Sequence, residues 1–472
     1  MELKDIGFKA GLEIHQQLDT GKLFCRCPSI LRQDAPDWIV KRKLHAVAGE
    51  LGDVDIAAKH EIEKGAEFVY EGYKDTNCLL EYDEQPPLEI DKDALKIAVQ
   101  AALILNCEII PFTQIMRKTV VDGSNTSGFQ RTVLIAKDGF VETSFGRVGI
   151  QTIMLEEDAA RKISEDSNHV VFRLDRLGIP LIEIATAPDM IVAEQVKETA
   201  LKLGEILRAC KVKRGIGTIR QDVNISVAQH PRVEIKGFQD PAMMIKTIEL
   251  EAERQKKEGK KGKPEVRRAN PDGTTTFLRP MPGSARMYPE TDLPLLKISR
   301  EFINEAKASL PKLKTEIKGE LKQKGLNDEM IKIVLDSGKL DEFETMLKIY
   351  NNPNFVARLM LVFPKEIASH EKVKEEIFSL DIIEEILENI AKKKITEADA
   401  KHVLESIAKG KSASDALKVE KAETGEIESE IAKIIKEKPG LNANAYMGLV
   451  MAKFKGKVNG KEVMEIIGKL LK

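Results

Sequence analysis

With 472 residues the chain is too long for one compact domain, and two or three domains are expected. Its 74 basic and 76 acidic side chains give a formal net charge of −2, so there is no overall attraction to nucleic acid and any RNA contact must come from a local basic patch. The five cysteines are an odd number in a chain rich in lysine and glutamate, which argues against a disulfide framework and indicates a reducing cytoplasm.

The pattern of predicted elements changes twice along the chain. Up to about residue 294, short alternating strands, glycine turns and a few helices follow one another. From residue 295 long helical patterns dominate, and the stretch GKSAS near residue 410 interrupts them. These changes predict an α+β protein with parts at 1–294, 295–408 and 409–472. No apolar run reaches membrane-spanning length, so no membrane association is expected.

The first predicted strand, GFKAGLEIHQQ, alternates between two faces. Apolar residues at positions 8, 10, 12 and 14 share one face, and Glu13, His15 and Gln17 share the other. In PLIEIATAPD, Glu183 stands between two isoleucines in the same way. The alternation recurs in GTIRQDVNISV and RVEIKG, whose polar faces carry Arg220, Asp222, Asn224, Ser226, Glu234 and Lys236.

This polar alternation has two interpretations. Antiparallel sheets commonly have one face in water, which alone produces it. Solvent-facing strands, however, favour threonine, lysine and scattered polar residues, whereas these strands carry glutamate, histidine, arginine, aspartate and asparagine in close alternation. Several such strands around one concavity would combine metal ligands with cations that bind phosphate. This combination favours Mg²⁺-assisted phosphoryl transfer, which needs positioning and charge neutralisation rather than a protein nucleophile.

Common nucleotide and zinc motifs are missing. The sequence has no G-x-x-x-x-G-K-[ST], so any ATP is expected to bind without a P-loop, and at His60 it reads HEIEK rather than H-E-x-x-H. Cys25-x-Cys27 could begin a zinc site, but no second cysteine pair follows at a suitable spacing, and ordinary thiols are expected. The charged stretch 254–268 is interpreted as a solvated surface loop rather than an RNA-binding element.

Long segments spread over the chain closely resemble one protein family. They are KAGLEIHQQLDTGKLFC, VDGSNTSGFQRTVLIA, GRVGIQTIMLEEDAARKI, LDRLGIPLIEIATAPD, VKRGIGTIRQDVNISV, RVEIKGFQ and LRPMPGSARMYPETDLP. From Leu12 to the C-terminal tail the chain resembles the GatB/GatE family of tRNA-dependent amidotransferase subunits. Gln17, DGSNTSGFQR and RMYPETD are similar to the archaeal branch, the GatE subunits of glutamyl-tRNA(Gln) amidotransferase, rather than to the bacterial branch.

The resemblance implies a fold and an activity. The fold would be an antiparallel-sheet cradle holding a kinase site, then a helical domain, then a small helical tail similar to YqeY proteins. ATP would phosphorylate the γ-carboxylate of glutamate on tRNA(Gln), and ammonia would displace the phosphate. The ammonia would come from GatD, an asparaginase-like glutaminase, in a heterotetramer of two GatD and two GatE subunits. The alternatives are a catalytically silent tRNA-binding or assembly subunit, and a bacterial-type subunit that also amidates Asp-tRNA(Asn).

The resemblance also implies roles for individual residues. Glu13, His15, Glu156 and Glu183 match the family's magnesium and catalytic positions, and motif alignment favours Glu156 over Glu157. Four further residues are interpreted as binding phosphate or as forming structural salt bridges, and three lysines as tRNA contacts or as a solvated face. These are Arg220, Asn224, Lys236 and Arg286 for phosphate, and Lys453, Lys455 and Lys457 for tRNA.

The sequence departs from the archaeal branch at one place. GatE subunits normally carry a domain resembling the insertion domain of bacterial aspartyl-tRNA synthetases, after the RVEIKGFQ segment. Here the chain passes through KKEGKKGKPE directly into VRRANPDGTTTFLRPMPG, and the inserted domain is expected to be missing. Because the flanking motifs are present, the kinase site is expected to be intact, whereas any tRNA selectivity that the domain provides is expected to differ.

Overall fold

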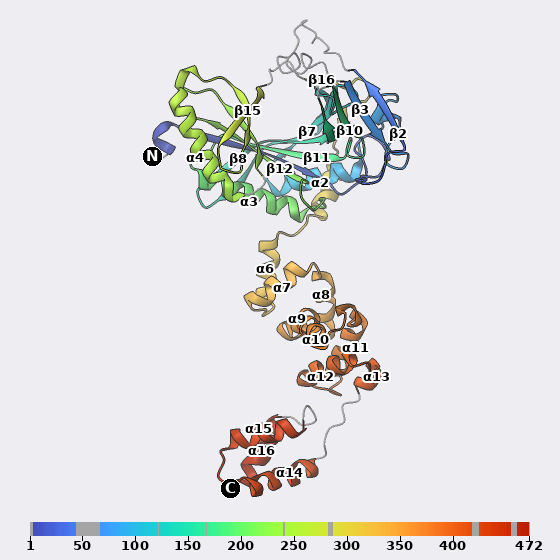
Figure 1. Cartoon of the computed structure of the whole chain (residues 1–472), viewed down its shortest axis with the longest axis vertical. Helices are drawn as coiled ribbons and strands as arrows, with labels where there is room; N and C mark the ends of the chain where they lie inside the picture. Colours follow the sequence, from blue (N-terminus) through green and yellow to red (C-terminus); the bar gives the residue numbers. More distant parts are fainter. Residues whose placement is uncertain are drawn as a thin grey trace. The chain divides into compact units, whose positions relative to one another are not determined.

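The computed structural model describes residues 3–43, 67–120, 122–166, 168–238, 241–281, 287–417, 424–454 and 460–471. The chain divides into two compact units, Met1–Leu313 and Lys314–Lys472. The first unit is built on β-sheets with helices against them, and the second is helical, so the predicted α+β class is confirmed (Figure 1).

A sheet of eleven strands forms the frame of the first unit. All its pairings are antiparallel except that of β13 with β14, where helix α4 makes the crossover that a parallel pair requires. The predicted antiparallel sheet is therefore confirmed, with this one parallel pair among the described strands. In order, the strands are β15 (Thr275–Pro280), β14 (Glu265–Ala269), β13 (Val233–Phe238), β12 (Ile219–Ser226), β1 (Lys9–Gln17), β11 (Pro180–Thr186), β8 (Gly146–Glu157), β7 (Phe129–Thr143), β6 (Ile115–Thr119) and β16 (Met287–Pro289), with β4 (Glu108–Ile109) also paired to β7.

Two smaller sheets contain the other strands among the described residues of this unit. One has four strands, in which β3 and β10 are parallel neighbours, and the other pairs two short strands. The described part of this unit also has three 3-10 helices. They are η1 (Leu3–Ile6), η2 (Leu79–Tyr82), which follows β3, and η3 (Gly259–Lys261). The smaller sheets contain β2 (Trp38–Arg42), β3 (Glu67–Gly72), β10 (His169–Arg173) and β9 (Arg161–Glu165), and β17 (Leu296–Lys297) with β5 (Phe112–Thr113).

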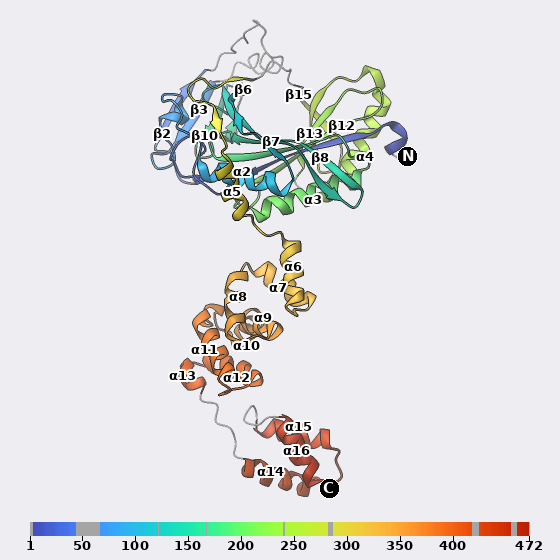
Figure 2. The same cartoon turned by 180° about the vertical axis from the view of Figure 1, so that it is seen from behind.

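Helices α2 (Lys92–Ile104), α3 (Ala193–Ala209) and α4 (Pro241–Glu258) cover one face of the large sheet (Figures 1 and 2). The predicted alternation explains why the helices pack on this face. Leu12 and Ile14 of β1 point to it and are fully buried in the shared core, whereas Glu13 and His15 point to the opposite face. Each buried Leu or Ile contributes about 1.5–3 kcal/mol to folding. The helices thus fix the sheet and leave its polar face available.

The first unit extends beyond the predicted boundary at residue 294. Helix α5 (Arg300–Ala308) packs against α2, and Ala306 belongs to the same hydrophobic core as the sheet. The side chain of Ser299 caps α5 by accepting a hydrogen bond from Phe302 N. A helical pattern alone therefore did not show which core this helix joins.

The second unit contains two hydrophobic cores. One extends from Leu321 to Ala416 and the other from Ile427 to Ile467. Ala416, in α13, packs into the first core, which therefore continues past the predicted boundary at residue 409. Within the described residues, no helix is long and apolar enough to span a membrane. The helices are α6 (Lys314–Gln323), α7 (Asp328–Ser337), α8 (Leu340–Ile349), α9 (Pro353–Leu361), α10 (Phe363–Glu371), η4 (Glu375–Ile377), α11 (Leu380–Ala391), α12 (Glu397–Ala408), α13 (Ala413–Ala416), α14 (Thr424–Glu437), α15 (Ala443–Phe454) and α16 (Gly460–Leu470).

Candidate active site

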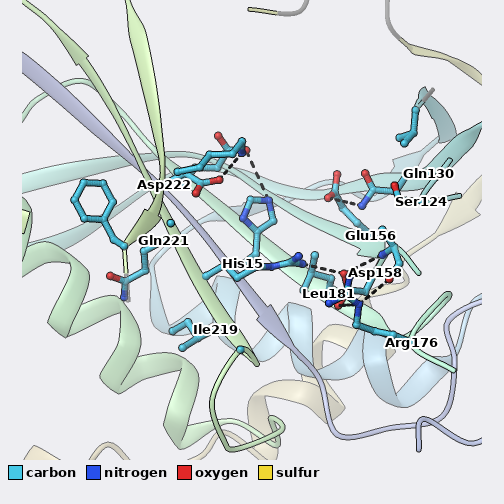
Figure 3. Close-up of a pocket in the computed structure, with 18 of the residues that line it drawn as sticks. His15, Ser124, Gln130, Glu156, Asp158, Arg176, Leu181, Ile219, Gln221 and Asp222 are labelled. Carbon is cyan, nitrogen blue, oxygen red and sulfur yellow. Dashed lines mark hydrogen bonds and ion pairs between the residues drawn. The ribbon is translucent and has the colours of Figure 1, made fainter. Parts of the chain in front are cut away.

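A cavity of about 990 Å³ opens on the polar face of the large sheet. Its lining includes residues of β1, β6, β7, β8, β11, β12, β13, β15 and α3 and of the loops that connect several of them. Figure 3 shows His15 in this cavity, with Asp222 on one side and Glu156 and Asp158 on the other. Polar residues predicted from three separate segments, those of β1, β12 and β13, therefore line one concavity.

His15 lies at the centre of a cluster of possible metal ligands. On its two sides in the sheet, His15 pairs with Glu183 of β11 and with Arg220 of β12. The distance from His15 Nε2 to Glu183 Oε2 is 3.0 Å, and that to Glu13 Oε1 is 3.8 Å. One ligand atom from each of Glu13, His15 and Glu183 lies within 4.8 Å of the others, a group that could hold a metal ion.

Glu156 lies beside this cluster rather than within it. Lys118 of β6 joins the two, because its Nζ atom is 3.2 Å from Glu156 Oε1 and 3.6 Å from Glu183 Oε2. Gln130 also donates a hydrogen bond of 3.1 Å to Glu156 Oε2. Of the four residues implied for the metal site, three form this group, and the fourth, Glu156, lies next to Glu183 without belonging to the group.

Glu156 and Glu157 face different surroundings. Glu156 lines the cavity, whereas the carboxylate of Glu157 accepts hydrogen bonds of 3.3 Å from the backbone N–H and the guanidinium of Arg131. Arg131 in turn binds Glu290, at 2.8 Å. The structure thus places Glu156, the residue that motif alignment favoured, at the cavity lining, which does not include Glu157.

Burial and mutual repulsion shift the acidity of the cluster. Burial and the nearby charge of Glu183 raise the pKa of Glu13 to about 7. Burial alone would lower the pKa of His15, but the hydrogen bond to Glu183 and the surrounding carboxylates outweigh it and raise the value. Burial would raise the pKa of Glu183, but His15 and Lys118 outweigh it and lower the value to about 2. The cluster concentrates negative charge in a confined place, which suits a divalent cation.

Two cations predicted to bind phosphate line the cavity, and both already have acidic partners. Arg220 donates a hydrogen bond of 2.9 Å to Asp158, and Lys236 Nζ lies 2.6 Å from Asp222 Oδ2 and 2.5 Å from Glu234 Oε1. Both residues therefore form the structural salt bridges that were the alternative to phosphate binding. Their position at the cavity is also compatible with phosphate binding.

The remaining predicted residues are placed less centrally. Asn224 does not line the cavity, and its buried Oδ1 atom has no hydrogen-bond partner among the described residues. Lys453, near the end of α15, forms an ion pair with Glu430. Arg286, Lys455 and Lys457 lie outside the described residues.

The comparisons with known proteins agree with this geometry. A family model described as the GatB/GatE catalytic domain matches residues 8–304, and a second one, described as a GatB domain, matches residues 341–471. The chain belongs to the GatB/GatE family. The match at 8–304 contains the whole cavity lining, and that at 341–471 begins well before the tail predicted at residue 409.

The chain aligns over its full length with archaeal proteins. Proteins named as E subunits of glutamyl-tRNA(Gln) amidotransferase are 36% identical in Methanocaldococcus jannaschii, 34% in Archaeoglobus fulgidus and 33% in Pyrobaculum neutrophilum. The alignments cover 99% to 100% of this chain and of each relative. The first runs over 626 residues against the 472 of this chain, so part of that relative has no counterpart here, in keeping with the predicted loss of an inserted domain.

Sequence reasoning missed two residues at the centre of this GatB/GatE site. Lys118 bridges Glu156 and Glu183, and buried Asp158 accepts hydrogen bonds from Gln17, at 2.6 Å, and from Arg220. Asp158 follows Glu156 in the segment LEEDA, and Lys118 occurs in the short strand IMRKT. Alternation in IMRKT could have marked Lys118, but its partners come from other strands.

Proposed function

We propose that this chain uses ATP and Mg²⁺ to phosphorylate the γ-carboxylate of glutamate esterified to tRNA(Gln), and that ammonia then replaces the phosphate to give Gln-tRNA(Gln). The observation that supports the proposal is the cluster of Glu13, His15 and Glu183, two of whose members line a cavity that Arg220 and Lys236 also line. The names of the relatives support the choice of substrate.

The residues present fit a magnesium ion. Mg²⁺ usually takes one or two carboxylates and completes its shell with water and substrate phosphates, and Glu13 and Glu183 supply two carboxylates here. In the proposal, Glu13, His15 and Glu183 hold the ion, and Glu156 completes the acidic wall. When bound, Mg²⁺ would neutralise charge on the phosphates of ATP.

The cationic side chains would supply the remaining charge neutralisation. A γ-carboxylate oxygen of the substrate attacks the terminal phosphorus of ATP, and the bond from that phosphorus to ADP breaks. Lys118 is positioned between Glu156 and Glu183 to neutralise charge that develops in this step, and Arg220 and Lys236 could hold the outer phosphates. Ammonia then attacks the activated carbonyl carbon, and inorganic phosphate leaves.

The proposal also includes a second subunit that supplies ammonia and a surface that contacts the tRNA. A separate asparaginase-like glutaminase, GatD, would supply ammonia, and two copies of each subunit would form the complex in the cytoplasm. The second unit would contact the tRNA through the basic residues of its last helices, among them Lys453. Such contacts with phosphates would provide affinity rather than sequence specificity.

A reconstituted reaction tests the proposal. The chain is mixed with Mg-ATP, Glu-tRNA(Gln) and ammonium chloride, and ADP and Gln-tRNA(Gln) are measured. We expect both products, with ADP release dependent on charged tRNA. ADP no higher than in a tRNA-free control would instead favour a silent binding or assembly subunit. Amidation of Asp-tRNA(Asn) in the same assay would favour the bacterial-type activity.

A further inference from the structure

A tight turn at the opening of the cavity exposes one isoleucine completely. The turn runs from Gly215 to Thr218, just before β12, and Gly215, Ile216 and Gly217 all belong to the cavity lining. Ile216 has a relative exposure of 105%, more than any other large hydrophobic residue among those that the structure describes. A single exposed apolar residue is ordinary on most surfaces. This one, however, offers an uncovered apolar contact beside a substrate cavity.

Local hydrogen bonds define the shape of the turn. The backbone N–H of Thr218 donates a hydrogen bond of 3.4 Å to the carbonyl of Gly215, and its hydroxyl donates another of 2.9 Å to the same oxygen. Gly217 has a φ of 84°, the left-handed value that a type II turn needs at its third residue and that glycine adopts without strain. Ile216 is the second residue of this turn, at its tip.

The base of the turn is tied to β1, the strand that carries two of the possible metal ligands. The N–H of Gln17 donates a hydrogen bond of 2.9 Å to the carbonyl of Thr218, and the N–H of Lys213 donates one of 3.0 Å to the carbonyl of Gln17. The buried side-chain amide of Gln16 donates to the carbonyls of Lys213 and Thr218, at 3.0 and 3.1 Å. These contacts fix the position of Ile216 relative to the strand and leave its side chain free.

The turn lies in a locally basic stretch of the chain. Arg208, near the end of α3, lines the cavity, and Arg214 directly precedes the turn. Arg214 donates a hydrogen bond of 3.1 Å to the carbonyl of Arg208, and neither exposed guanidinium forms an ion pair with another described residue. Guanidinium groups bind phosphate and also stack on flat rings. From residue 206 to residue 221 no side chain is acidic and five are basic, namely Arg208, Lys211, Lys213, Arg214 and Arg220.

We propose that this turn binds the single-stranded 3′ end of the tRNA, with one base packed against Ile216 and the neighbouring phosphates held by Arg208 and Arg214. The inference rests on the proposed function, in which the reacting glutamate is esterified to the 3′-terminal ribose. That linkage requires the last nucleotides to lie at the opening of the cavity in which the carboxylate reacts. Proteins hold unpaired bases by packing them against apolar or aromatic side chains and guanidinium planes.

The adenine of ATP is the other flat ring that could pack against Ile216. A site for a small ligand usually encloses it and buries about 70–90% of its surface. Ile216 has no such enclosure, and a Cβ atom placed on Gly215 or Gly217 would meet no described atom within 4 Å. An open platform suits one base of a longer chain that is also held elsewhere along its length. The turn is therefore assigned to the tRNA end, which leaves ATP to the interior of the cavity.

Binding of two tRNAs by the full chain tests the proposal without depending on catalysis. One is uncharged tRNA(Gln), and the other is the same tRNA without its three 3′-terminal nucleotides. We expect Ile216→Ser to raise the Kd of the intact tRNA about 5- to 10-fold, the lower range for one base packed on a side chain, and to leave the Kd of the shortened tRNA nearly unchanged. Ile216→Leu keeps an apolar side chain and should bind both tRNAs as the wild type does. Arg214→Ala should lower the salt slope for the intact tRNA by about 0.7, the value for one phosphate contact of a single strand.

Ile191→Ser is the matched control. Ile191 is also an exposed isoleucine, with a relative exposure of 41%, but it does not line the cavity. It follows Met190, which pairs with Ala10 near the start of β1, whereas the turn is tied to the end of that strand. The control should leave both dissociation constants unchanged.

The outcomes separate this inference from the proposed function. An equal effect of Ile216→Ser on both tRNAs, or no effect, overturns the inference, as does a wild-type chain that does not distinguish the two tRNAs. Weaker binding of Mg-ATP by Ile216→Ser with unchanged tRNA binding also overturns it, because the turn would then hold the adenine of ATP. A wild-type chain that binds the tRNA end through Ile216 but forms no ADP with Glu-tRNA(Gln) contradicts the proposed catalysis alone.

Discussion

His15 on β1 and Glu183 on β11 stand directly opposite each other in neighbouring antiparallel strands, with His15 Nε2 at 3.0 Å from Glu183 Oε2. The sheet ladder itself sets this contact, because directly opposed side chains on one face are the closest neighbours in a sheet. Sites built on strands hold their geometry more closely than sites built on loops. The proposed magnesium position is therefore preorganised by the fold.

Replacing His15 by alanine should abolish most ATP cleavage. The change removes one of three clustered ligands, and we expect at least a 100-fold fall in tRNA-dependent ADP formation, the scale for loss of one preorganised electrostatic group. Binding of tRNA, measured by filter retention, should be nearly unchanged. His169→Ala is the matched control, because His169 lies on the four-stranded sheet, outside the cavity lining, and is partly exposed. Wild-type ADP formation by His15→Ala would disprove the site assignment.

Glu156→Gln and Glu157→Gln should have opposite effects: the first should lower activity and the second should lower stability. Glu156 lines the cavity beside Lys118, so its change should reduce ADP formation with little effect on thermal stability. Glu157 binds buried Arg131, so its change should destabilise the first unit by about 1–3 kcal/mol and leave the activity of folded protein largely intact. Melting curves and ADP assays on both variants test this. An inactive but stable Glu157→Gln would reverse the assignment.

The sequence predicted the parts of the site that depend on local periodicity. Alternation in β1 and β12 placed Glu13, His15 and Arg220 on one polar face, because successive side chains of a strand always point to opposite sides. Which carboxylate each cation binds depends on strands that are distant in sequence. Arg220 lies on β12 and Asp158 directly follows β8, so their contact depends on the strand order β12-β1-β11-β8, which no local pattern contains.

In the fold, too, local periodicity predicts some features and contacts between distant segments decide the others. Strands and helices follow from periodicity, whereas the assignment of α5 to the sheet unit depends on packing of Ala306 against residues far away in the sequence. Cys25, Cys27, Cys78 and Glu81 likewise form a group of possible metal ligands that a motif search did not find, since carboxylates are too common for their spacing to stand out. Tertiary contacts decided each of these cases.

Arg220→Ala should distinguish phosphate binding from a structural salt bridge. Asp158 would keep its hydrogen bonds from Gln17 and from the backbone N–H of Ala159, so the local fold should survive. If Arg220 binds phosphate, the KM for ATP should rise about 10- to 100-fold, as expected for loss of a charged hydrogen bond. Arg147→Ala, at an exposed ion pair with Glu142, is the control. A lower melting temperature with an unchanged KM would support the salt-bridge interpretation.

The fully buried Glu290 should make stability depend on pH. It binds Arg117, with distances of 2.5 and 2.9 Å, and Arg131, at 2.8 Å. Burial would raise the pKa of Glu290, but these arginines and the N–H of Asp292 outweigh it and lower the value. The stability that Glu290 contributes is therefore complete above its unfolded pKa, near 4.3, and is lost as the pH falls through its lowered folded value.

Glu290→Gln should accordingly destabilise the first unit by about 1–3 kcal/mol at neutral pH, because it removes the buried carboxylate that Arg117 and Arg131 share and leaves them only the more distant carboxylates of Asp292 and Glu157. The melting temperature of the variant should fall less steeply than that of the wild type below pH 4.5. Glu108→Gln, at an exposed position, should reproduce the wild-type curve. Parallel curves for Glu290→Gln and the wild type would contradict the assignment.

Removal of the last helices should weaken tRNA binding. Truncation at Gly448 would cut through α15 and expose the core around Ile431, so the deletion should begin at residue 418 and remove α14, α15 and α16 together. We expect a larger dissociation constant for tRNA and a shallower dependence on salt, because fewer lysine–phosphate contacts release fewer counterions. Cleavage of ATP at saturating tRNA should persist, since the cavity lies in the other unit. An unchanged dissociation constant and salt slope would show that these helices do not contact the tRNA.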